Sequence, residues 1–138
     1  WRVDKILERE ISDAAVADLD GDGEDELVTF EGFHGDVAAV NKRVNGAWQM
    51  VYTLDMHFSH AIWAGELLGR NMFVVGYRKE GGRMYLVEHT DQGYQAMLLE
   101  EGIAPSNARG FVYEGRSYIA VAARDMDQVV LFELKEEP

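Results

Sequence analysis

The stretch DLDGDGEDEL, from Asp18 to Leu27, places six acidic residues and two glycines among ten positions. Counted from Asp18, acidic side chains stand at positions 1, 3, 5 and 9, a glycine stands at position 6, and position 7 offers a backbone carbonyl. Hard oxygen ligands at alternate positions, with a glycine where the backbone turns sharply, are typical of a Ca²⁺ loop. The predicted metal ligands are Asp18, Asp20, Asp22, Glu24 (through its carbonyl) and Glu26.

Two other interpretations of this stretch are an EF-hand and a metal-free acidic turn. An EF-hand needs a bidentate glutamate at position 12 and a helix on each side. Position 12 is Thr29, and both flanks alternate like strands, so the EF-hand is rejected. The remaining alternative is a solvated acidic turn that binds no metal. A divalent cation is the favoured interpretation because it removes the repulsion among the converging carboxylates.

The chain contains a repeat with a period of 47 residues. The matches include two sets of three residues, Ser12, Ser59 and Ser106, and Ala14, Ala61 and Ala108. The repeat divides a single domain, 1–138, into units 1–47, 48–94 and 95–138, the last with short deletions. Each unit contains four short alternating runs separated by turn pairs such as NG and GG, which predicts four strands.

Repeats of about 40–50 residues with four strands each are typical of β-propeller blades. We therefore expect an all-β fold of three four-stranded antiparallel blades. Closed propellers have about 4–8 blades, so three blades require further blades, either in the same protein or from another copy. The run WRVDKIL (residues 1–7) is expected to be an outer strand, and the chain is expected to end on the third strand of a blade, so its two ends could pair.

The motif DLDGDGEDE resembles the signature D-x-D-G-D-G-x-x-[DE] of the FG-GAP/VCBS-repeat β-propeller family. The resemblance implies that the metal is structural. The corresponding loops of the second and third units read GELLGRN and YEGRS and have lost the aspartates, so one Ca²⁺ per chain is expected.

Antiparallel strands allow the loops to be assigned to two ends of the molecule. If the acidic loop is at the bottom, then His34, His60, Arg78 and Arg124 fall at the top. Asp13, His60 and Asn107 share one frame of the repeat and begin the innermost strands, which predicts a polar ring around one mouth of a channel. Other ligand-binding candidates at this end are Phe33 and Tyr77, as a stacking platform for a sugar, and Asp36.

A second resemblance covers roughly residues 12–134. The run TFEGFHGDVAAVNK…HFSHAIWAGELLGRNMFVVGYRK is similar to the aldos-2-ulose dehydratase-like branch of these propellers, although Gly32 stands where that pattern has proline. The resemblance implies carbohydrate chemistry at His34, Asp36, His60, Trp63 and Arg78. Elimination next to a carbonyl needs a base and a positive group for the developing charge, and His34, His60 and Arg78 are the candidate catalytic residues.

Composition narrows the classes of partner. The formal net charge of −12 disfavours nucleic acid and anionic membranes, and no apolar run approaches the roughly 18 residues of a membrane helix. No cysteine is present, which excludes thiolate chemistry.

The sequence is compatible with three functions. The first is a Ca²⁺-stabilised module that binds a carbohydrate or protein on its top face, the second is a carbohydrate lyase or dehydratase, and the third is a structural domain with a vestigial site. Ca²⁺ loops of modest affinity favour an extracellular or periplasmic location.

Overall fold

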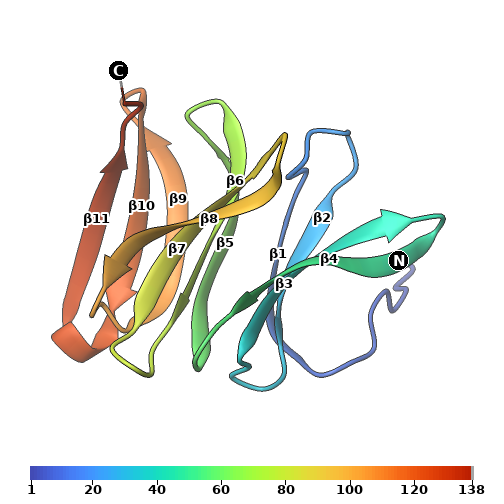
Figure 1. Cartoon of the computed structure of the whole chain (residues 1–138), viewed down its shortest axis with the longest axis horizontal. Coiled ribbons are helices and arrows are strands. Elements are labelled where there is room, and N and C mark those ends of the chain that lie inside the picture. Colours follow the sequence, from blue (N-terminus) through green and yellow to red (C-terminus); the bar gives the residue numbers. More distant parts are fainter. Residues whose placement is uncertain (138) are drawn as a thin grey trace.

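The computed structural model describes residues 1–137, and within that range it contains eleven β-strands, one 3-10 helix and no α-helix (Figure 1). The strands form three antiparallel sheets. The first sheet consists of β1 (Ile11–Ala17), β2 (Glu26–Glu31), β3 (Val37–Val44) and β4 (Ala47–Asp55). The second consists of β5 (Ser59–Leu67), β6 (Arg70–Tyr77), β7 (Arg83–Thr90) and β8 (Gly93–Glu101). The third consists of β9 (Pro105–Tyr113), β10 (Arg116–Ala123) and β11 (Gln128–Leu134), with the 3-10 helix η1 (Arg124–Met126) between its last two strands.

Local sequence explains the hairpins. The pairs Asn45-Gly46, Leu68-Gly69 and Glu114-Gly115 are two-residue connections in which both residues have positive φ. This is the backbone of a type I′ turn, whose twist matches that of the strands it joins. Glycine at the second position adopts such an angle without steric cost. The all-β class predicted from the sequence is therefore confirmed, and so is the division of the chain into three successive antiparallel sheets.

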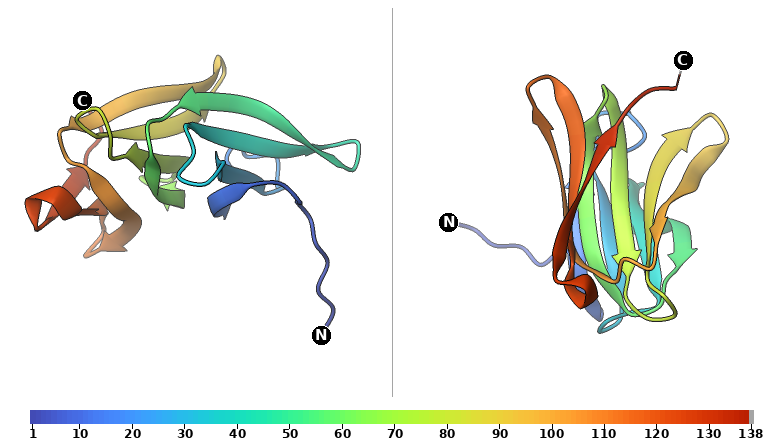
Figure 2. Two further views of the ribbon diagram at one scale, coloured as in Figure 1. Left: turned by 90° about the horizontal axis from the view of Figure 1, so that it is seen from below. Right: turned by 90° about the vertical axis from the view of Figure 1, so that its left-hand side faces the viewer.

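Two layers of apolar side chains join the three sheets. One cluster lies between the first and second sheets and includes Val28, Phe30 and Phe73. The other lies between the second and third sheets and includes Val74 and Ile119. Trp63 packs against this second cluster. The sheets fan outward from the side where β1, β5 and β9 neighbour one another (Figures 1 and 2).

Among residues 1–137 the third sheet has three strands rather than four, which agrees with the expectation that the chain ends on the third strand of a unit but not with three four-stranded sheets. The predicted outer strand over residues 1–7 is also absent. These residues form no strand, and Trp1 and Val3 are fully exposed. A strand needs a neighbour to satisfy its backbone groups. The N-terminal residues lead away from the sheets and have none among residues 1–137 (Figure 2). The three sheets do not close into a ring.

No helix within the described residues has the length and apolar character needed to span a membrane.

Candidate functional site

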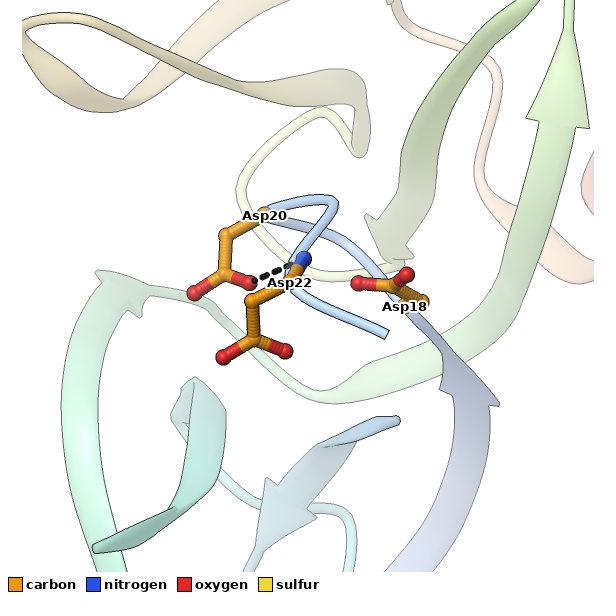
Figure 3. Close-up of side chains that lie close together, drawn as sticks. All are labelled: Asp18, Asp20 and Asp22. Carbon is orange, nitrogen blue, oxygen red and sulfur yellow. Dashed lines mark hydrogen bonds between the residues drawn. The ribbon is translucent and has the colours of Figure 1, made fainter. Parts of the chain in front are cut away.

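The acidic loop connects β1 to β2, and its three aspartates converge (Figure 3). One carboxylate oxygen from each of Asp18, Asp20 and Asp22 lies within 4.8 Å of the others. The backbone of the loop holds them in place. Asp18 accepts hydrogen bonds from the N–H groups of Gly21 (2.9 Å) and Gly23 (3.0 Å), and Asp20 and Asp22 each accept one from the N–H two residues ahead. The predicted ligands at positions 1, 3 and 5 are therefore gathered at one point.

The fourth carboxylate of the loop is buried. Glu26 is completely buried, and its Oε2 accepts a hydrogen bond from the N–H of Leu19 at 2.7 Å. Its Oε1 has no hydrogen-bond partner among residues 1–137. Burial raises the pKa of Glu26. The side chain of Glu24 is exposed.

Lys42, on β3, is the component of this loop that the sequence did not reveal. Its ammonium group donates hydrogen bonds to Asp20 and Asp22 and lies 3.4 Å from Oε1 of Glu26. These bonds lower the pKa of Asp22 and raise that of Lys42. The loop thus already holds one positive charge among its carboxylates, which offsets part of their mutual repulsion.

At the other ends of the strands, three rings form what we call the histidine cluster: His34, Phe58 and His60. His34 stacks on Phe58 with ring centroids 4.4 Å apart and lies 4.6 Å from His60. Phe58 and His60 are 5.0 Å apart. His34 comes from the β2–β3 loop, and the other two rings come from the start of β5. The prediction that His34 and His60 lie at the same end of the molecule is confirmed.

Unusual backbone angles position these rings. His34 has a φ of 48° and Phe58 a φ of 68°, values that non-glycine residues seldom adopt. His60 falls in a β-bulge where the β5–β6 register shifts between Ser59 and Ala61. A bulge redirects a side chain, and strained residues of this kind gather at functional sites.

Hydrogen bonds clamp the loop that carries His34 onto the chain before β5. The N–H of Phe58 donates to Oδ1 of Asp36 at 3.3 Å, and the hydroxyl of Ser59 donates to the carbonyl of Gly35 at 2.7 Å. A Cβ added to Gly35 would lie 1.6 Å from the carbonyl oxygen of Glu31, so the close turn after His34 admits only glycine. Asp36 therefore supports the cluster by fixing Phe58.

Two arginines bring positive charge to His60. Arg78 follows β6 and forms an ion pair with Asp125 at 3.1 Å, and Arg124 begins η1. Burial, followed by the charges of His34, Arg78 and Arg124, lowers the pKa of His60. Two buried atoms, Nε2 of His60 and Nε of Arg78, have no hydrogen-bond partner within the described chain. Nε of Arg78 is a donor, whereas Nε2 of His60 donates or accepts according to the tautomer of the ring.

A cavity of about 260 Å³ adjoins the histidine cluster. Its lining includes Asp13, Phe33, His34 and His60. The ring of Phe33 meets His34 edge-on at 4.2 Å and is 75% exposed, so it can contact a ligand. A cavity lined by apolar side chains together with a few polar ones is typical of a small-ligand site.

Other predicted ligand-binding residues lie elsewhere. Arg124 lines a different cavity, together with Ser106 and Ala122. Tyr77 is only 3% exposed and packs in the core between the first two sheets, so its ring offers no surface for stacking. Asn107 lines a separate cavity of about 520 Å³ that also includes Trp63 and Ala108. The repeat frame therefore brings Asp13 and His60 together in one cavity but not Asn107.

Neither a scan against protein-family models nor a search of curated proteins finds a match to this chain.

Proposed function

We propose that this chain is a segment of a β-propeller of the FG-GAP/VCBS type, and that the end carrying the histidine cluster binds an acidic carbohydrate. The proposal of a propeller is supported by the repeat of 47 residues and by three antiparallel sheets that neighbour one another through β1, β5 and β9. The histidine end carries Phe33, whose exposed ring suits the apolar face of a sugar.

The observation that carries the proposal is Nε2 of His60, a buried atom without a hydrogen-bond partner in the described chain, in a residue that lines the cavity beside Phe33. A buried polar atom without a partner costs free energy, on the order of 1–3 kcal/mol. A ligand that bonds to such atoms recovers that cost. Arg78 and Arg124 supply positive charge, so a sugar carboxylate fits this end of a molecule whose net charge is otherwise strongly negative.

Calorimetric titration with an oligogalacturonate tests this proposal. His60→Gln and Arg78→Met are each expected to weaken binding by about 10- to 100-fold, because a charge-assisted hydrogen bond contributes about 1.5–3 kcal/mol. The matched control is His89→Gln, since His89 packs on Tyr94 in the β7–β8 hairpin. Two results would count against the proposal. One is that both site variants bind oligogalacturonate with the affinity of the wild type, and the other is that the chain binds a protein ligand but no oligogalacturonate.

A second candidate function, a lyase or dehydratase, is favoured by the lowered pKa of His60. A neutral imidazole at neutral pH can accept a proton from the carbon next to a carbonyl or carboxylate, while the oxygen on the adjacent carbon leaves as a C=C bond forms. His34 and Arg78 would then orient the substrate and hold the developing negative charge. An unsaturated product, followed by its ultraviolet absorbance, would distinguish catalysis from binding alone.

The acidic loop is proposed to hold one structural Ca²⁺ per chain. The supporting observations are the convergent oxygens of Asp18, Asp20 and Asp22 and the buried Oε1 of Glu26, which accepts no hydrogen bond within the described chain and has only the Lys42 ammonium group nearby. The ion would supply a divalent charge that these oxygens can share. Lys42 competes for the same carboxylates, so its removal gives the sharpest test of this assignment.

A further inference from the structure

The third sheet lacks the outer strand that the other two sheets possess. In the first sheet β4 pairs with β3, and in the second β8 pairs with β7. In the third, β11 pairs with β10 on one side, and its other edge has no partner among residues 1–137. An open edge of this kind is a template for another strand.

The N-terminal arm, residues 1–7, has the sequence of an outer strand but pairs with nothing in the described chain. In the repeat frame Trp1 corresponds to Trp48 and Leu7 to Leu54, both in β4. The arm is exposed along most of its length, including Trp1, Val3 and Ile6. Just after it, Arg9 forms two 2.7 Å hydrogen bonds to Glu31, which fixes the base of the arm on the first sheet.

We propose that the arm of a second copy of this chain pairs antiparallel with β11 and completes the third sheet. The chain's own arm starts from the first sheet, whereas β11 lies in the third sheet, and the second sheet separates the two (Figure 1). Reciprocal exchange between two copies gives a two-fold symmetric ring of six four-stranded sheets, within the usual size range of closed propellers.

The pairing register follows from the first sheet. Thr29 on β2 pairs with Ala39, which pairs with Thr53 on β4. Thr29 pairs with Ala14, and Val121 pairs with Ala108, the residue that corresponds to Ala14 in the repeat. Val121 therefore occupies in the third sheet the position that Thr29 occupies in the first. Val121 pairs with Val130, so Val130 corresponds to Ala39. Thr53 corresponds to Ile6 in the repeat, which sets Ile6 opposite Val130.

The remaining pairs in this register are chemically matched. The bulge of β4 at Val51 corresponds to Asp4. Beyond it, Val3 falls opposite Phe132 and Trp1 opposite Leu134, while Arg2 falls opposite Glu133. Val130, Phe132 and Leu134 share one face and pack against the core between the second and third sheets. The apolar residues of the arm thus extend an existing apolar row, and the one acidic residue of β11 meets a basic one.

Solution mass is the first test of this strand exchange. The chain has a mass of 15.6 kDa, and light scattering at micromolar concentration is expected to give twice that value. A chain without residues 1–7 is expected to be monomeric with unchanged circular dichroism, since the arm contacts none of the apolar core. A monomeric chain of residues 1–138 would overturn the proposal, as would a dimer that persists without the arm.

An engineered disulfide tests the register, because the chain has no cysteine of its own. Ile6→Cys with Val130→Cys is expected to give a covalent dimer under mild oxidation, since directly paired strand positions lie within disulfide distance. The control, Lys5→Cys with Val130→Cys, places the two side chains on opposite faces and is expected to remain uncrosslinked. A disulfide within a single chain, or equal crosslinking of both pairs, would refute the exchange. The proposal rests on the ring architecture but not on ligand binding, so its failure leaves the titration result intact.

Discussion

The substitution Lys42→Met is the most informative change to the acidic loop. It removes the positive charge that now faces the carboxylates of Asp20 and Glu26 but keeps much of the aliphatic stem. Breaking a fully buried ion pair costs about 3–5 kcal/mol. Lys42 keeps 22% of its side-chain surface exposed, so we expect a smaller loss, about 2–3 kcal/mol, in the absence of metal.

Calcium is expected to reverse this loss. A ligand at 100 times its Kd stabilises the folded state by about 2.7 kcal/mol, which for a chain of this size raises Tm by about 8 °C. Scanning calorimetry of the wild type and of Lys42→Met, each in EDTA and in CaCl₂, measures both effects. The variant is expected to show the larger rise with calcium, because no ammonium group competes for the carboxylates.

Lys135→Met serves as the control, since the side chain of Lys135 is 72% exposed and pairs only with Glu133. It is expected to leave Tm and the response to calcium unchanged. If neither the wild type nor Lys42→Met responded to calcium, the loop would be an acidic turn closed by lysine, and the reasoning that assigns it a metal would be refuted.

Three further predictions concern stability. Gly35→Ala forces a Cβ against the carbonyl of Glu31 and is expected to destabilise the loop of His34 by more than 3 kcal/mol, measured by urea unfolding; a loss below 1 kcal/mol would contradict the turn geometry. Gly110→Ala places a Cβ 2.6 Å from the ring of Trp63 and is expected to cost about 1–3 kcal/mol, seen as a lower urea midpoint, whereas an unchanged midpoint would mean that the ring is loosely packed. Because the pKa of His60 is lowered in the folded state, the unfolded chain binds the proton first, so stability is lost as pH falls below about 6.5. His60→Gln is expected to flatten the pH dependence of the free energy of unfolding between about pH 7 and 5, and an identical slope would show that His60 is not perturbed.

Much of the fold follows from local sequence. Alternating runs and turn pairs such as Asn45-Gly46 predicted the strands and hairpins, since the signal lies within a few residues. Strand direction alone predicted that His34 and His60 share an end, because each strand reverses the sense of the one before. The convergence of Asp18, Asp20 and Asp22 was predicted from their spacing at alternate positions of the loop.

The features that the sequence did not reveal depend on contacts between distant segments. Lys42 reaches the acidic loop only because β3 pairs with β2, and nothing near Lys42 marks it as a partner of Asp20. Phe58 enters the histidine cluster through a positive φ that an aromatic residue seldom adopts. Tyr77 was misplaced although a signal existed, since it alternates with Phe73 and Val75 on the buried face of β6.

The ligand site at the histidine end is tested most directly by nuclear magnetic resonance during a titration with oligogalacturonate. Chemical-shift changes are expected at His34, Phe58, His60 and Arg78, with none at Asp20 or Lys42 near the other end of the strands. Changes confined to the acidic loop, or none at the two histidines at saturating ligand, would contradict the assignment of the binding site.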